Sequence, residues 1–491
     1  MNLIKESKTL QATYGGSGSF KSFKDLKKLY KQTKKMGLPL SQKHWTSDYW
    51  FGAQRIQGAN PVLIKLARSI PTNLDFDPSV VKEILGGMTL QEAVDAKRIF
   101  KIDLKVLKDL PCAGGRTICC PIALFYLDQK KNDLLPLCIQ LFQEPNETNP
   151  VFYPTDPPYA WLVAKMYYNN ADSAMHQSIT HLGFTHIIME GTVICTHRHL
   201  SEAHPMFKLM APHFLFLLAI NKRGLDKLIN IGGWVDKTTV YGVEGMLEVM
   251  RRKLDVWKLD EDPIPPADCA RRGVLDKFVL PYYPYRDDAV AVYYLIEKYV
   301  RTVVRHFYDS PDKIEHDYEL QNWAAELVRP REEGGLGLNG IAGNGRFTHV
   351  EQIVSVISAM ICTCSVGHAA SNFMQYDEYG FPPNYPAFLV GEFPTQKEGF
   401  TEKDIFDQLP PQNLILDAMV VTRLLSTRGT QPLGDFEVQY LHDPVSVAAA
   451  EQLRQDLRGV SDNIRKRNAA KTTRFPYPWL DPDGIPNSIS I

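Results

Sequence analysis

Two neighbouring segments, ten residues apart, decide the fold: Trp161-Leu-Val-Ala-Lys165 and His176-Gln-Ser-Ile-Thr-His-Leu-Gly-Phe-Thr-His186. Apolar residues recur through both at helical spacing, which predicts one long helix over 161–200. Three histidines of the second segment are spaced by five residues, and seven of the chain's thirteen histidines lie between His176 and His213. Imidazole nitrogen is a good ligand for several transition metals. The cluster therefore indicates a metal site on this helix.

The spacing of the histidines sets a geometric condition on the helix. Residues five apart lie about 140° apart on a regular α-helix, so His181 and His186 cannot face one ion. A π-helical distortion brings them together, and such distortions cluster at functional sites. Farther along the chain, His368 and Asn372 are four residues apart and share one helical face. Histidines on helices are often plain core residues, so the metal hypothesis depends on both segments together.

Composition excludes several classes of protein. The 491 residues are 44% hydrophobic and 23% charged, as in an ordinary globular protein. A net charge of −1 gives no general attraction to nucleic acid. The eight cysteines form no CxxC pairs, so we expect reduced thiols in a cytoplasmic protein. The N-terminus has no apolar signal region, and the apolar run 214–220 is too short to span a membrane.

The remaining periodicity predicts a mainly α fold with a small antiparallel sheet. Further long helices are expected over 206–230, 287–308, 349–374 and 443–467. Segments 117–127 and 133–143 are rich in apolar and β-branched residues around the turn 129–133, which predicts a hairpin. Gly335-Leu-Gly-Leu-Asn-Gly340 matches a dinucleotide fingerprint, but no strand precedes it, so we expect a plain loop.

Residues 20–36 are expected to form a basic amphipathic helix, with lysines between the apolar residues Phe20, Phe23, Leu26, Leu29 and Tyr30. One interpretation is peripheral contact with an anionic membrane or a fatty-acid carboxylate. The other is a surface helix packed on the body of the protein.

Several motifs together resemble the lipoxygenase catalytic domain, most closely the animal-type branch. They are the two opening segments, Phe51-Gly-Ala-Gln-Arg-Ile-Gln-Gly-Ala-Asn60, His204-Pro-Met-Phe207, Gly367-His-Ala-Ala-Ser-Asn-Phe-Met-Gln375 and the terminal Ile485-Pro-Asn-Ser-Ile-Ser-Ile491. The resemblance implies a catalytic domain over 46–491 after a basic N-terminal segment, 1–45. Members usually begin with a PLAT/C2-like β-barrel domain, which we expect to be absent here, either in a short natural form or in a fragment.

The resemblance implies a non-haem iron site cycling between Fe²⁺ and Fe³⁺, with manganese as the less favoured metal. The implied ligands are His181, His186, His368, Asn372 and the α-carboxylate of Ile491. Gln177 and Gln375 match amides that link the ligands to the substrate cavity. His176 is then a neighbour of the site. The other clustered histidines are expected to be structural: His197, His199, His204 and His213.

The implied reaction inserts O₂ into a polyunsaturated fatty acid that holds a cis,cis-1,4-pentadiene, and yields a hydroperoxide. Leu182, Ile187 and Leu228 match aliphatic positions that flank the pentadiene, although each is also a plausible core residue. Two alternatives stay open: a fatty-acid hydroperoxide isomerase on the same fold, and a non-catalytic lipid-binding protein. Oxygen uptake with conjugated-diene formation would separate the dioxygenase from both.

Selectivity is expected to depend on Gly224, which matches the position where Ala accompanies S products and Gly accompanies R products. A glycine inside a helix lowers stability by about 1 kcal/mol relative to alanine, so its presence needs an explanation. The alternative explanation is a close helix crossing at this position. Small residues at Ser173, Thr238 and Thr239 suggest a deep cavity for a C20 substrate such as arachidonate, unless they are ordinary hydroxyl residues. Arg223 matches an arginine proposed to meet the substrate carboxylate, and a plain surface arginine is the alternative.

Overall fold

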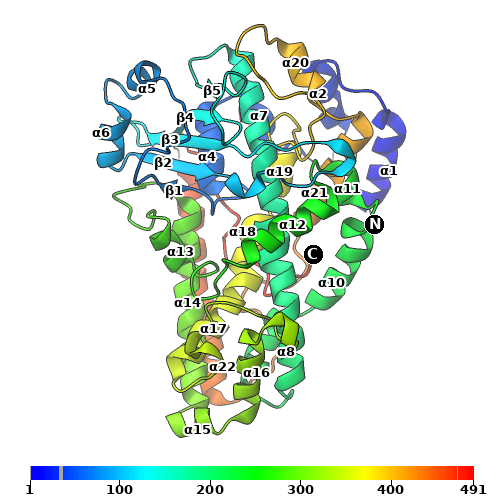
Figure 1. The fold of residues 1–491 in the computed structure, drawn as a ribbon. Helices are drawn as coiled ribbons and strands as arrows, with labels where there is room; N and C mark the ends of the chain where they lie inside the picture. The colour runs from blue at the N-terminus through cyan, green and yellow to red at the C-terminus, as the bar shows by residue number, and fades with distance from the viewer. Residues whose placement is uncertain (1, 33–36, 471, 473) are drawn as a thin grey trace.

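A computed structural model describes residues 2–32, 37–470, 472 and 474–491. Long helices form the body of the molecule, and a small sheet with its covering helices lies at one end (Figure 1). The sheet is antiparallel throughout, and the strands follow one another in chain order. This architecture confirms the predicted mainly α fold with a minor antiparallel sheet.

The sheet contains five strands: β1 (Lys65–Leu66), β2 (Ile99–Asp103), β3 (Ile122–Leu127), β4 (Leu134–Gln140) and β5 (Val151–Phe152). The predicted hairpin is confirmed as β3–β4. Its turn closes where the Asp128 amide donates to the Asp133 carbonyl, 3.0 Å away. Alternate side chains point to opposite faces of a strand. Accordingly Ala123 and Phe125 join the main core, whereas Ile122 and Leu124 join a smaller core.

The smaller core lies under α5 (Pro78–Ile84) and α6 (Leu90–Asp95). The other helices before the long bundle are α1 (Asn2–Tyr14), α2 (Phe23–Gln32), α3 (Ser41–His44) and α4 (Asp48–Gln57). Around and after the bundle lie α9 (Pro205–Met210), α10 (Leu217–Gly224), α11 (Trp234–Thr238), α12 (Gly242–Leu254), α13 (Pro265–Arg271), α15 (Pro311–Glu315), α16 (Tyr318–Val328), α19 (Gln375–Tyr379), α20 (Glu402–Asp407) and α21 (Gln412–Leu425).

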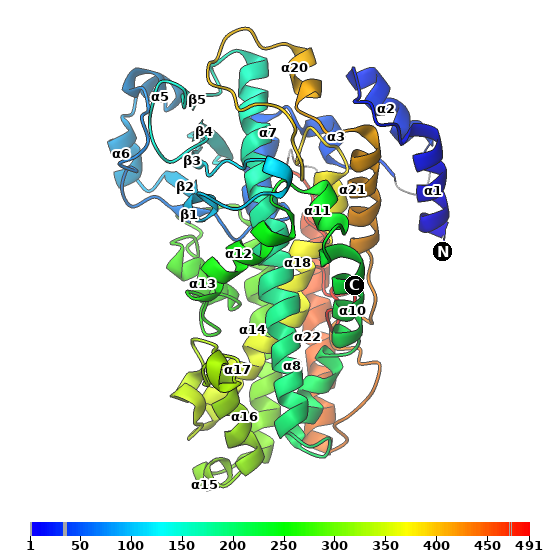
Figure 2. The same cartoon turned by 45° about the vertical axis from the view of Figure 1, so that its right-hand side comes forward.

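Two interrupted helices form the centre of the bundle. The first runs from α7 (Pro158–Met175) through a π-helix, η3 (His176–Ile187), into α8 (Ile188–His199). The second runs from α17 (Val350–Cys362) through a short π-helix, η8 (Thr363–Gly367), into α18 (His368–Asn372). Both were predicted as continuous helices, and both are continuous but locally widened. Figure 2 shows them side by side.

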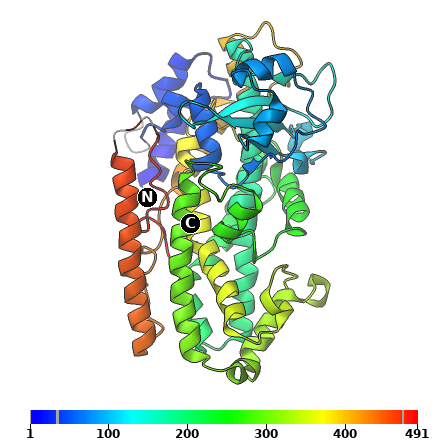
Figure 3. The same cartoon turned by 90° about the vertical axis from the view of Figure 1, so that its left-hand side faces the viewer.

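The two remaining long helices flank this centre. They are α14 (Pro284–Phe307) and α22 (Pro444–Ala469), close to the predicted ranges 287–308 and 443–467. They pack against each other, and α14 also packs on α17 (Figure 3). The run Val350–Tyr379 is long and apolar enough to cross a membrane, but 89% of its most apolar window is buried inside the protein. Its apolar character is therefore explained by its position in the core of the protein.

The prediction of one helix over 206–230 is wrong. The chain breaks between α9 and α10, where Phe216 takes the left-handed conformation with φ of 67°. Pro212 lies in the same break, and its ring cannot continue an α-helix from the preceding turn. Beyond α10 the helix widens again into a π-helical turn, η5 (Leu225–Ile229).

The basic helix expected over 20–36 is α2, and residues 33–36 lie outside the described part of the chain. Leu26, Leu29 and Tyr30 on α2 are buried, and so is Phe20, which precedes the helix. Phe23 packs edge-on against Phe406, with ring centroids 4.8 Å apart. The structure thus favours the packed surface helix, because the apolar face is not free for a membrane. The glycine-rich 335–340 follows α16 and forms a loop, as expected.

Candidate metal centre

Three buried histidines from the two widened helices face one another. They are His181 and His186 on η3, and His368 at the start of α18. Their ring centroids lie 5.0 to 5.3 Å apart in every pair. One nitrogen from each ring lies within 4.8 Å of the other two. Nitrogens this close can share one ion.

The π-helix is what brings His181 and His186 together. The predicted distortion near 181–186 is confirmed and extends over the whole of His176–Ile187. Gly183 lies within this segment at a close contact. A Cβ there would lie 2.8 Å from the Ser178 carbonyl oxygen and 3.3 Å from Cγ of Met250. The absence of a side chain lets the widened helix pack against α12, which carries Met250.

Burial keeps these imidazoles neutral. It lowers the pKa of His186 to about 4 and the pKa of His181 and His368 well below the usual value. A neutral imidazole has a free lone pair, which is the form that binds metal. The Nε2 atom of His181 is buried without a hydrogen-bond partner in the described part of the chain. Such an orphaned atom is costly unless something binds it, so the residues present fit a metal ion.

Asn221 on α10 fixes the orientation of His186. The Nδ1–H of His186 donates to Asn221 Oδ1 at 2.8 Å, which leaves the Nε2 lone pair directed toward His368 Nε2, 3.2 Å away. The Asn221 amide in turn donates to the His186 carbonyl and to Glu190. Asn221 was not among the predicted site residues. It lies between Ile220 and the charged Lys222, so its position in the sequence does not single it out.

A chain of amides lies beside the histidines. Gln177 Nε2 donates to Gln375 Oε1 at 2.9 Å, and Gln375 Nε2 donates to Asn372 Oδ1 at 2.8 Å. The Asn372 amide donates to the Leu425 carbonyl. The Asn372 side chain also acts on His181, where it opposes the lowering of the His181 pKa by burial. The structure therefore brings Gln177, Gln375 and Asn372 to the histidines.

The C-terminal segment enters the helical body and is buried at Ile485, Asn487, Ser488 and Ile489. Figure 2 shows the C-terminus beside α10 and α18. The Asn487 carbonyl accepts a hydrogen bond from His213 at 2.9 Å. Further bonds connect the tail to residues 431–435. The described chain therefore ends, at Ile491, near α18, the helix that carries His368.

The other clustered histidines have structural partners. His176 accepts from Tyr379 and donates to the Ser371 carbonyl, so both of its nitrogens are used. His199 pairs with Glu326, and His204 pairs with Asp317. The His197 ring packs on Phe207.

A second group with metal-binding geometry contains Cys195, His199 and Glu326. Glu326 already pairs with Arg198 and His199. Burial raises the pKa of the Cys195 thiol to about 12, so it stays protonated. This group is an ion-pair network that does not need a metal.

Gly224 occupies open space. It is the last residue of α10, and a Cβ there would meet no heavy atom within 4 Å. A close helix crossing therefore does not explain this glycine. Asn221 and Gly224 are three residues apart and lie on the same side of the helix. Because Asn221 contacts His186, Gly224 lies on the side of α10 that faces the histidines.

The remaining predicted site residues lie around this helix and its neighbours. Leu182 and Leu228 are half-buried, Ile187 is 37% exposed, and Arg223 is exposed. Ser173, Thr238 and Thr239 are buried, and each hydroxyl donates to a backbone carbonyl three or four residues earlier. Thr238 also lines a small cavity beside Tyr379 and Tyr385.

Comparison with known proteins gives one consistent family. The lipoxygenase family model matches residues 36–476. The chain is 31% identical to a rat polyunsaturated fatty acid lipoxygenase, ALOX15B, over 97% of this chain and 70% of the relative. It is 31% identical to a mouse hydroperoxide isomerase, ALOXE3, over 96% of this chain and 66% of the relative. The crystal structure of a calcium-dependent 11R-lipoxygenase superposes with a TM-score of 0.93 at 31% identity, over 100% of this chain and 72% of that one. The chain belongs to the lipoxygenase family of fatty-acid dioxygenases.

Proposed function

We propose that this enzyme is a non-haem iron dioxygenase that converts C20 polyunsaturated fatty acids into R-hydroperoxides. The observation that carries the proposal is the buried group of three neutral histidines, with the orphaned Nε2 of His181, in a chain of the lipoxygenase family. Iron bound there would supply the one-electron chemistry that removes a hydrogen atom from the bis-allylic carbon.

The proposed ligand set is His181, His186, His368, Asn372 and the α-carboxylate of Ile491. Asn221 holds the His186 ring in the tautomer that presents Nε2. The hydrogen bond from Gln375 to Asn372 orients the amide of that ligand. His213 holds the C-terminal tail through the Asn487 carbonyl, which supports a fixed position for the carboxylate.

The proposed R stereochemistry depends on Gly224. With no heavy atom within 4 Å of its Cβ position, the helix leaves room for O₂ at the end of the pentadiene that an alanine methyl would cover. The R-type relative among the solved structures supports this assignment. The small buried side chains of Ser173, Thr238 and Thr239 support a cavity for a C20 chain.

One assay tests the function. Purified metal-loaded protein is incubated with arachidonate, and oxygen uptake, conjugated dienes and product chirality are measured. We expect oxygen uptake and an R-hydroperoxide. Loss of a supplied hydroperoxide without oxygen uptake would instead favour an isomerase, the activity named for the mouse relative. A mainly S product would overturn the stereochemical assignment alone.

A second experiment tests the terminal ligand. Addition of one glycine after Ile491 displaces the α-carboxylate while leaving every side chain in place. We expect loss of bound iron, measured by elemental analysis, together with loss of activity. Retention of full iron content and activity would remove Ile491 from the ligand set.

A further inference from the structure

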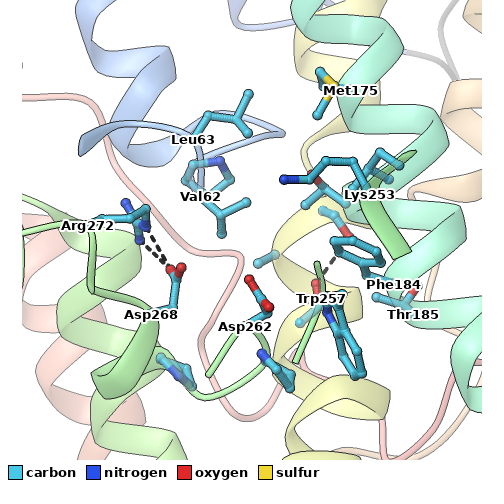
Figure 4. Close-up of a pocket in the computed structure, with 18 of the residues that line it drawn as sticks. Val62, Leu63, Met175, Phe184, Thr185, Lys253, Trp257, Asp262, Asp268 and Arg272 are labelled. Atoms are coloured by element: carbon cyan, nitrogen blue, oxygen red, sulfur yellow. Dashed lines mark hydrogen bonds and ion pairs between the residues drawn. The ribbon is translucent and has the colours of Figure 1, made fainter. Parts of the chain in front are cut away.

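A second cavity lies behind the metal-binding helices. It has a volume of about 290 Å³. Its inner wall is formed by Ile179, Thr180, Phe184 and Thr185 of η3 and by Val366, Gly367, Ala370 and Ser371 around η8 and α18. Its outer wall includes Val62, Leu63 and Trp257 (Figure 4). His181, His186, His368 and Asn372 are not among the residues that line it. The cavity is thus separated from the metal side by the helices themselves.

The interior of the cavity combines apolar side chains with the hydroxyl residues Thr180, Thr185 and Ser371, and charged residues line its rim. Met175, Ile179, Phe184 and Trp257 supply apolar surface. Most rim charges are already neutralised. Arg272 pairs with Asp268, as drawn in Figure 4, and Arg271 pairs with Asp262 and Asp268.

Two rim cations have no such partner. Within the described residues, the side chains of Lys65 and Lys253 take part in no ion pair and no hydrogen bond. Lys65 and Lys253 are also close enough to repel each other. Figure 4 shows the Lys253 side chain extending across the cavity from α12. Burial lowers the pKa of this lysine.

A half-buried ammonium without an ion-pair partner is unfavourable, because it loses hydration and gains little in return. Asp262 and Asp268 attract Lys253, but neither forms an ion pair with it, and both already pair with Arg271. An anion bound at the rim would remove that cost. A flexible apolar chain attached to the anion would fill the interior, where pockets gain most of their binding energy from apolar contact. The two features together describe an anionic amphiphile.

We propose that this cavity is a second acyl-binding site, which holds a long-chain fatty acid with its carboxylate at Lys253. The chain lies against Phe184, Ile179 and Met175. The site is distinct from the one where Gly224 and Arg223 lie, since α10 contributes nothing to the lining. This second site goes beyond the proposed function, and the observations that support it come from the cavity and do not depend on the dioxygenase activity.

The first test measures binding to the full-length, metal-loaded chain. Oleate is the probe, because its single double bond gives the enzyme no pentadiene to oxidise. Oleyl alcohol is the uncharged control. Titration calorimetry on wild type, Lys253→Met and Lys237→Met gives the dissociation constants. Lys237→Met is the matched control, since Lys237 is an exposed lysine on α11, outside the cavity.

We expect Lys253→Met to weaken oleate binding about tenfold, equivalent to about 1.4 kcal/mol, and to leave oleyl alcohol binding unchanged. Lys237→Met should match wild type for both probes. Equal oleate affinity in wild type and Lys253→Met would overturn the proposal. The melting temperature of each variant is recorded, and Lys253→Met should not lower it because an unpaired charge is removed.

The second test locates the ligand, because oleate is also expected to bind at the proposed catalytic site. A palmitate analogue with a photoreactive diazirine near the middle of its chain is cross-linked, and the labelled peptides are identified by mass spectrometry. We expect label on peptides that contain Phe184 or Trp257, and loss of that label in Val62→Trp, which fills the cavity. Label confined to the α10 and α21 peptides would overturn the proposal.

Oxygen uptake with arachidonate is measured on the same preparations and separates the two proposals. Oxygenation without labelling of the cavity would refute the second acyl site and leave the dioxygenase proposal intact. Labelling of the cavity without oxygenation would support the second acyl site and refute the dioxygenase proposal. Lys253 lies outside the proposed ligand set, so Lys253→Met should keep its oxygenase activity.

Discussion

At the scale of single residues, two positions on α10 carry different parts of the proposed chemistry. Asn221 orients His186, a proposed metal ligand, through a hydrogen bond, whereas the proposed role of Gly224 depends on its having no side chain. Both lie on the same side of one helix. The first is therefore expected to affect the metal, and the second to affect the product.

Gly224→Ala is expected to raise the share of S product severalfold, because the new methyl group covers the space proposed for O₂. Chiral analysis of the hydroperoxides measures this. Gly459→Ala is the matched control, since Gly459 also lies in a helix with no heavy atom near its Cβ position. Both changes should stabilise the protein by up to about 1 kcal/mol. An unchanged product ratio in Gly224→Ala would contradict the assignment.

Asn221→Ala is expected to weaken metal binding about 10- to 100-fold, the usual effect of removing a hydrogen-bond partner of a ligating histidine. The His186 ring would lose the acceptor for its Nδ1–H. Chelator competition measures the metal affinity directly. Lys222→Ala, at the adjacent exposed residue, should leave it unchanged. If the two variants retain metal equally, Asn221 has no positioning role.

At the scale of elements, the two π-helices at the centre of the bundle, η3 and η8, are packed differently, although η3 carries His181 and His186 and η8 leads into His368. Gly183 in η3 is in close contact with the backbone, with 2.8 Å from its Cβ position to the Ser178 oxygen. Gly367 in η8 is not, because its nearest neighbour is 3.6 Å away. The glycine is thus required by packing in η3 but not in η8.

Gly183→Ala is expected to destabilise the protein by about 1–3 kcal/mol, the usual cost of overpacking a filled core. Gly367→Ala should be neutral or stabilising, because its Cβ makes only ordinary contact. Denaturant unfolding of the two variants measures the difference. Equal stabilities would show that the close approach in η3 relaxes without cost.

At the scale of the whole molecule, a buried polar network joins segments far apart in the chain. Glu378 of α19 accepts hydrogen bonds from Gln54 of α4 and from Asn384. Asn384 also accepts from Trp50. Nearby, Arg55 of α4 pairs with Asp172 of α7. Burial raises the pKa of Glu378 from 4.5 to about 7.

A carboxyl group whose pKa is raised by folding holds its proton more tightly in the folded state. Its contribution to stability is fully present below pH 4.5 and is lost as the pH rises through 7. Glu378→Gln cannot ionise, so at pH 8 it should be more stable than wild type by up to about 3 kcal/mol. Unfolding at pH 5 and pH 8 measures this. The exposed control Glu398→Gln should follow wild type, and identical behaviour of both variants would contradict the assignment.

Much of the fold was predictable because local patterns and tertiary packing agree. The long helices are amphipathic or wholly apolar, so their period appears in the sequence. The π-distortion was predictable too, since two ligands five residues apart cannot converge on a regular helix. The break at 211–216 was not predicted, because the apolar period continues through it and only the backbone of Phe216 reveals the turn.

The sequence by itself determined the family and predicted the two helices that carry the proposed ligand histidines, because both depend on residue type and spacing. Only the tertiary structure decided which residues support them. Asn221 is 35 residues from His186, and the tail that His213 holds is 274 residues away. The cavity behind the three histidines, with Lys253 at its rim, exists only where six separate stretches of the chain meet. The spacing of residues along the chain reflects the geometry of a single helix. The burial of a side chain, and whether it has a hydrogen-bond or ion-pair partner, are decided only when distant segments pack together.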